Sequence, residues 1–202
     1  MADRVAALGL RHHTGWAIMV AIAGDPSNPQ LVDRRRLNLM GSDLPREAYH
    51  VAAGLPAADG QRLVSEAKAA AELTARLEVS RVKAEIEEQG YELRSAGLAA
   101  DVRRLPTLER ILPVHILRHS AEGEIFRSAI AEACSEAGLE VVNTSPKDIS
   151  MLIASQFDMP QVALTDVLTR MGREAGPPWQ RDHREATMAG MLALASVTSK
   201  VS

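Results

Sequence analysis

Aromatic residues are scarce in this 202-residue chain, where Phe, Trp and Tyr together make up only 3% of the sequence. Proteins that bind single-stranded nucleic acid by base stacking rely on aromatic side chains, so the composition argues against that mode of binding. The core must instead be built from aliphatic residues, mainly Ala, Leu, Val and Ile, together with eight Met.

Cysteine and long hydrophobic runs are also lacking. Cys134 is the single cysteine, so the chain can form neither an internal disulfide nor a cysteine metal cluster. Its Ala-rich neighbourhood indicates a buried apolar position, with a reactive thiol as the alternative. The longest apolar run, residues 16–23, is far shorter than the ~20 residues of a membrane span. The first residues do not resemble a signal peptide, and we expect a cytoplasmic protein without membrane contact.

The chain has no excess of positive charge, because its formal net charge is −3. Any contact with nucleic acid would therefore have to come from a local basic patch. Apolar residues make up 46% and charged residues 24%, a profile typical of globular proteins. With this length, we expect residues 1–202 to form a single domain.

Two apolar segments near the N-terminus are typical of strands buried on both faces: residues 5–10 and 16–23. A polar turn carrying His12 and His13 would join them. Residues 30–39 predict a third strand whose side chains alternate between an apolar and a polar face. Leu31, Leu37 and Leu39 would share one face, and Val32, Arg34, Arg36 and Asn38 the other. A polar face of this kind favours the edge of a sheet.

The rest of the chain alternates helices and strands. After an irregular segment at 40–60, we expect a helix at 61–89, a strand at 91–100, a helix at 121–137 capped by Ser120, a strand at 139–144, and a helical region from 146 whose last helix starts at Asp182. The predicted fold class is α/β. Three antiparallel strands, followed by two strands joined through helical crossovers, would form a five-stranded mixed sheet with helices on its faces.

Three groups of residues carry a resemblance to a known family. Gly9-Leu10 followed by Thr14-Gly15-Trp16-Ala17 matches its first hairpin; the stretch from Ala121-Glu122-Gly123 to Ser145-Pro146 matches its middle helix, next strand and Ser-Pro helix start; and residues 182–194 match its final helix, where two acids lie three apart. In this respect the chain resembles the ribonuclease-H-like superfold, most closely its RuvC-like branch of Holliday-junction resolvases. The similarity spans nearly the whole chain.

The resemblance implies metal-dependent hydrolysis of phosphodiesters, in which carboxylates hold two Mg²⁺ or Mn²⁺ ions. The family takes these carboxylates from its first strand, its fourth strand and its final helix. Here Arg11 stands where the first-strand aspartate is expected, and Asp101 lies just past the fourth strand. Asp182 and Glu185 match the acids of the final helix.

Alternatives remain open for these residues. Asp182 and Glu185 also fit a capping box at a helix start, which requires no metal. His12 and His13 could join them as ligands of zinc or manganese, or could belong to a polar turn with one hydrogen-bonded histidine. His119 and the pair Glu122/Glu124 fit helix-start chemistry, whereas His50, His115 and His183 show no partner pattern.

Two functional hypotheses follow. The first is a non-catalytic ribonuclease-H-like protein that binds or scaffolds nucleic acid or a protein partner without a cofactor. Arg11, Arg34 and Arg36 are its candidate nucleic-acid contacts, although the run 34–36 also fits a solvated sheet edge. The second is a divergent Mg²⁺- or Mn²⁺-dependent nuclease. Its candidate catalytic residues are Asp182, Glu185, His12 and His13, and its candidate metal ligands are Asp182, Glu185 and Asp101. Homodimerisation stays open.

Overall fold

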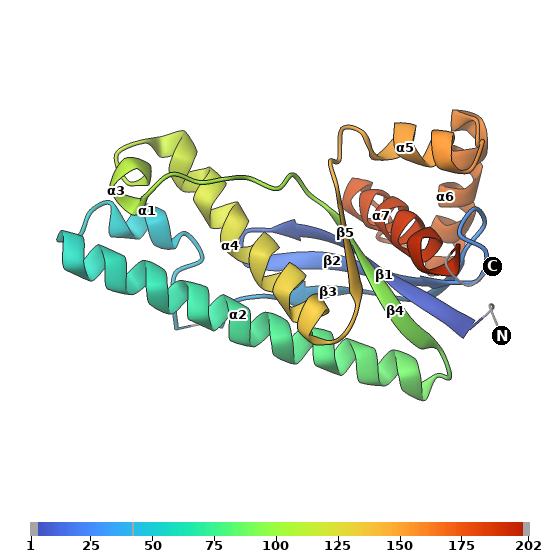
Figure 1. Cartoon of the computed structure of the whole chain (residues 1–202), viewed down its shortest axis with the longest axis horizontal. Coiled ribbons are helices and arrows are strands. Elements are labelled where there is room, and N and C mark those ends of the chain that lie inside the picture. The colour runs from blue at the N-terminus through green and yellow to red at the C-terminus, as the bar shows by residue number, and fades with distance from the viewer. Residues whose placement is uncertain (1–3, 42, 200–202) are drawn as a thin grey trace.

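A five-stranded sheet lies between two layers of helices in the computed structural model, which describes residues 4–41 and 43–199 (Figure 1). The strands are β1 (Val5–His13), β2 (Trp16–Ala23), β3 (Gln30–Asn38), β4 (Glu92–Ala99) and β5 (Glu140–Thr144). Their order in the sheet is β3-β2-β1-β4-β5. The pairs β1–β2 and β2–β3 are antiparallel, and β1–β4 and β4–β5 are parallel. The predicted mixed sheet is confirmed.

The helices cover both faces of this sheet. They are α1 (Ala48–Ala52), α2 (Ala57–Glu88), α3 (Leu108–Ile111), α4 (His115–Glu136), α5 (Ile149–Gln156), α6 (Gln161–Ala175) and α7 (Arg181–Thr198). In Figure 1, α2 and α4 cross one face, and α5, α6 and α7 cover the other. None of the helices among the described residues combines the length and hydrophobicity that crossing a membrane requires.

Several predicted boundaries were wrong. The segment 40–60, predicted to be irregular, contains α1 and the first residues of α2. Helix α4 starts at His115 rather than near residue 121, so Ser120 lies inside the helix and does not cap it. Nothing between 115 and 120 breaks a helix, and Val114 is the extended residue that precedes it. His12 and His13 belong to β1, and only Thr14 and Gly15 form the turn.

Side chains along β1 alternate between the two helical layers. Leu8 and Leu10 belong to the core cluster beneath α2 and α4, and His12 faces the same way. Arg11 and His13 point to the other side, where they contact α7. The two adjacent histidines therefore lie on opposite faces of the sheet.

Strand β3 forms one edge of the sheet, as predicted, but its faces differ from the prediction. A bulge shifts the register, so that Ala21 pairs with Asp33 while Ile22 pairs with Leu31. As a consequence Leu31 packs on the α7 side and Leu37 on the α2 side, and the predicted common face is wrong. A bulge adds one residue to a strand and so reverses the alternation beyond it.

Helix α7 packs with its backbone directly against the centre of the sheet. A Cβ atom at Gly9 of β1 would lie 1.8 Å from the carbonyl oxygen of Ala186, and one at Gly97 of β4 would lie 1.9 Å from that of Ala189. These two glycines let the helix approach closely and fix its first turn beside the ends of β1 and β4.

Cys134 is fully buried in the core between α4 and the sheet. Burial raises the pKa of its thiol to about 12. The thiol is therefore protonated at neutral pH, which supports the apolar interpretation over the reactive one.

Candidate functional site

Three elements that carry candidate site residues converge at the end of the sheet where β1 and β4 stop and α7 begins. Arg11 connects these three elements. Its Nε donates to Oε2 of Glu185 at 2.7 Å, and its Nη1 donates to the carbonyl oxygens of Ala99 at 3.3 Å and His12 at 3.4 Å. One guanidinium therefore ties the first strand to the fourth strand and to the last helix.

Glu185 has both carboxylate oxygens engaged. While Oε2 accepts from Arg11, Oε1 accepts from Nε of Arg181 at 2.6 Å. The Glu185 residue is only 5% exposed, so the carboxylate lies between two guanidinium groups in a largely dry environment. This group of three carries a formal charge of +1, which opposes the approach of a divalent cation.

Asp182 is paired with a histidine. Its Oδ2 lies 2.9 Å from Nε2 of His13. The His13 ring stacks on Trp16, with ring centroids 4.2 Å apart and the planes 14° apart. The guanidinium of Arg36 also lies over Trp16, 4.2 Å from the ring centroid. Stacking thus holds His13 in the orientation that contacts Asp182.

The capping box at the start of α7 is formed by other residues than predicted. The helix begins at Arg181, with Gln180 as N-cap, and the backbone N–H of Gln180 donates to Nδ1 of His183 at 3.2 Å. The predicted capping pair of Asp182 and Glu185 is therefore wrong. The helix starts one residue earlier than expected, which places Glu185 in the helix interior facing β1.

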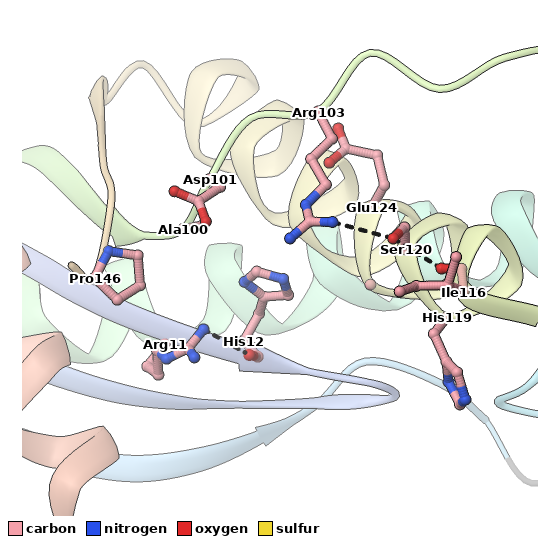
Figure 2. Close-up of a pocket in the computed structure, with 11 residues that line it drawn as sticks. Arg11, His12, Ala100, Asp101, Arg103, Ile116, His119, Ser120, Glu124 and Pro146 are labelled. Carbon is pink, nitrogen blue, oxygen red and sulfur yellow. Dashed lines mark hydrogen bonds between the residues drawn. The ribbon is translucent and has the colours of Figure 1, made fainter.

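On the opposite face of the sheet, His12 lines a cleft of 430 Å³ between the ends of β1 and β4 and the first turns of α4 (Figure 2). Other polar lining residues are Asp101, Arg103, His119, Ser120 and Glu124. Arg11 also lines the cleft, because its guanidinium reaches the carbonyl oxygen of Ala99 at the end of the sheet. Arg103 Nη1 donates to Oγ of Ser120 at 3.1 Å, closing one side of the cleft. The pKa of His12 is lowered to about 4, mainly by burial and to a smaller extent by the charges of Arg11, His13 and Arg127. His12 is therefore neutral at physiological pH.

The structure separates the candidate metal ligands. His12 and Asp101 line the cleft on the α4 side. His13 and Glu185 lie on the α7 side, where His13 contacts Asp182 and Glu185 contacts Arg11. Within residues 4–41 and 43–199, no group of three or more close ligand atoms includes any of these four or Asp182. The chain does form such a group elsewhere, among histidines for which the sequence showed no pattern.

The candidate nucleic-acid contacts are held in internal contacts. Besides Arg11 and Arg36, Arg34 donates to the carbonyl oxygen of Pro177 at 3.1 Å and also to that of Pro178, which anchors the segment ahead of α7. Two exposed arginines that were not predicted as contacts, Arg103 and Arg104, lie in the extended segment that follows β4. The adjacent pair of cations beside Asp101 was the available signal.

The order of the strands, their pairing directions and the placement of the last helix define a ribonuclease-H-like fold of the RuvC-like type. No protein-family model and no curated protein matches the sequence. Among solved structures, RuvC of Thermus thermophilus in complex with a Holliday junction substrate has 10% identity and a TM-score of 0.56, covering 96% of each chain. A second structure of Thermus thermophilus RuvC has 10% identity and a TM-score of 0.55, covering 96% of this chain and 97% of that one. The predicted RuvC-like fold is confirmed.

Proposed function

We propose that this chain is a non-catalytic ribonuclease-H-like protein that binds nucleic acid at the end of the sheet formed by β1, β4 and α4. One observation carries the proposal. Arg11 occupies the strand position where the resemblance expects a metal-binding aspartate, and it forms an ion pair with Glu185 at 2.7 Å.

The physical argument concerns charge. A two-metal site needs several carboxylates with free oxygen atoms to offset the charge of two divalent cations. Here Glu185 is bound by Arg11 and Arg181, and Asp182 is bound by His13. Loading a metal would require breaking these contacts and placing a cation beside a guanidinium.

Nucleic acid is the partner that the surface of this region favours. Arg103 and Arg104 are exposed in the extended segment after β4, and Arg103 lies at the cleft. The Arg181 side chain, on the first turn of α7, is 83% exposed. Arginine side chains of this kind bind phosphate groups through paired hydrogen bonds. The structurally similar RuvC was solved with a Holliday junction substrate, which makes branched DNA the first substrate to test.

The second candidate function is the divergent nuclease. It is favoured by the location of Asp182 and Glu185, which lie on the first turns of α7 beside the end of β1, as the resemblance implies. A metal could bind there only after Arg11 and His13 release the two carboxylates. Mg²⁺ or Mn²⁺ would have to supply that free energy.

The test measures binding and cleavage on the same substrates. Fluorescently labelled four-way junctions, duplexes and single strands are incubated with the wild-type chain and with Asp182→Ala/Glu185→Ala, in Mg²⁺ or Mn²⁺. We expect the wild type to bind at low salt and to leave every substrate intact. Metal-dependent cleavage that disappears in the double variant would establish the nuclease instead. Failure to bind any nucleic acid at low salt would exclude the proposal and leave a protein partner or a homodimer as the ligand of this surface.

A further inference from the structure

Three histidines from two distant parts of the sequence come together beside the cleft. His50 lies on α1, and His115 and His119 lie on the first turns of α4. The ring centroids of His50 and His115 are 5.1 Å apart, and each lies 4.5 Å from the centroid of His119. One nitrogen from each ring falls within a group whose atoms are all within 4.8 Å of one another. Figure 2 shows His119 pointing away from His12 and the middle of the cleft.

His50 carries the strongest sign of a missing ligand. Its Nδ1 lies 2.8 Å from Oε1 of Glu122, and its backbone N–H donates to the same oxygen at 3.1 Å. The other ring nitrogen, Nε2, is buried and has no hydrogen-bond partner. A buried polar atom without a partner costs about 1–3 kcal/mol, so such atoms are rare unless something binds them.

Glu122 holds the His50 ring in the orientation that carboxylates give to metal-binding histidines. The residue is only 1% exposed, and its second oxygen lies 3.8 Å from Nδ1 of His119. Histidines that bind metal commonly use one ring nitrogen for the ion and the other for a carboxylate, which fixes the ring orientation. With Nδ1 of His50 facing Glu122, Nε2 is the atom left to face an ion.

The positions of His115 and His119 fit the same ion. They are four residues apart on a helix, so their side chains lie one above the other on a single face. A tetrahedral zinc ion with bonds of about 2.0 Å requires ligand atoms roughly 3.3 Å apart. Both residues are exposed, so small rotations of their side chains can bring the nitrogens to that spacing.

We propose that His50, His115 and His119 bind one divalent transition-metal ion, with Glu122 orienting His50. Three imidazole nitrogens favour Zn²⁺ and similar ions over Mg²⁺ or Ca²⁺, which prefer oxygen ligands. The exposed side of the site leaves a fourth position for water or another small ligand. The ion would link α1 to α4, and would therefore fix the segment that contains α1 against the helical layer.

The test is a titration of the tag-free 202-residue chain with ZnCl₂ by calorimetry. We expect one Zn²⁺ per wild-type chain, and an affinity at least 100-fold weaker in His115→Ala/His119→Ala. Both substituted residues are exposed, so the variant should fold. Ile116→Ala is the matched control, because Ile116 is 72% exposed on the same helical turn and offers no ligand atom. Its affinity should equal that of the wild type.

Two further measurements make the outcome decisive. Glu122→Gln should weaken Zn²⁺ binding by about 10- to 100-fold while retaining the stoichiometry. Co²⁺ should give the wild type, but not the double histidine variant, the visible absorption of a four-coordinate site. The proposal is overturned if the wild type binds no stoichiometric Zn²⁺, or if the double histidine variant binds it with unchanged affinity.

Discussion

The guanidinium of Arg11 connects β1 to β4 and α7, three elements that carboxylates and metal ions would join in a two-metal site. In the two-metal site that the resemblance implies, cations would bridge acids from the first strand, the fourth strand and the last helix. Here Arg11 itself carries the positive charge and binds a carboxylate on α7 and a carbonyl oxygen at the end of β4. The same three elements are joined, while the charge that would activate water is fixed on a side chain. A buried pair of this kind defines geometry more than it adds stability.

His12 leads to a prediction about pH. Its pKa in the folded chain is about 4, and in the unfolded chain it should be near 6.5. The unfolded state therefore binds the proton more readily, so the stabilisation is complete above pH 6.5 and is lost as the pH falls toward 4. We expect His12 to account for about 3 kcal/mol of lost unfolding free energy over this interval.

Urea denaturation between pH 4 and pH 7.5 measures this effect, with His12→Gln as the comparison. The variant should lose less stability than the wild type as the pH falls, because Gln does not titrate. The difference between the two isolates His12 from His183, whose pKa is also lowered by burial and by Arg34. Parallel pH curves for the two proteins would contradict the prediction.

At the scale of single residues, local sequence signals identified residues of the candidate site, but they did not identify the side chains that those residues contact. The Gly9-Leu10 motif singled out Arg11, which contacts α7 and the end of β4. Its partner Glu185 is 174 residues away, and the Asp-x-x-Glu spacing of α7 suggested a local cap instead. The histidine cluster was missed because His50 joins His115 and His119 only through the packing of α1 on α4.

At the scale of elements, α7 depends on the glycines beneath it. Gly9→Ala would place a Cβ atom 1.8 Å from the carbonyl oxygen of Ala186, and neither backbone can move without separating the helix from β1. We expect a loss of roughly 3 kcal/mol or more of unfolding free energy, at the upper end of the range for overpacked cores. Chemical denaturation measures it.

Gly123→Ala is the control for this prediction. Gly123 lies inside α4, and a Cβ atom there would meet no atom within 4 Å. Alanine should stabilise the helix by up to about 1 kcal/mol relative to glycine. If Gly9→Ala were as mild as the control, the direct contact between α7 and β1 would be disproved.

Elements were more predictable than their fine structure. Apolar runs identified the buried strands, and the strand–helix order gave the parallel pairs. The bulge in β3 was not foreseeable, because alternation of side chains carries no mark of an extra residue. Helix α4 was predicted to start six residues too late, since no side chain caps its actual start and the sequence signal for a cap lay at Ser120.

At the scale of the whole molecule, the net charge of −3 does not determine what the cleft end of the sheet attracts. At 0.1 M salt, the electrostatic attraction between exposed charges is screened beyond about 10 Å. The charges close to the cleft therefore dominate the electrostatic force on a ligand there. Arg103 and Arg104 are the exposed cations in the segment that crosses from β4 toward α3. If nucleic acid binds here, the salt dependence should depend on this pair.

We therefore predict that Arg103→Ala/Arg104→Ala weakens DNA binding and reduces the slope of log K against log salt by about 1 to 2, since each phosphate contact contributes about 0.9. Fluorescence anisotropy from 25 to 200 mM salt provides the measurement. Arg62→Ala/Arg76→Ala removes the same charge from exposed positions on α2, where the side chains are 66% and 51% exposed. If DNA contacts Arg103 and Arg104 directly, only Arg103→Ala/Arg104→Ala should change the slope of log K against log salt. Equal changes in both variants would show that net charge alone governs binding, and no change in either would place the DNA on another surface.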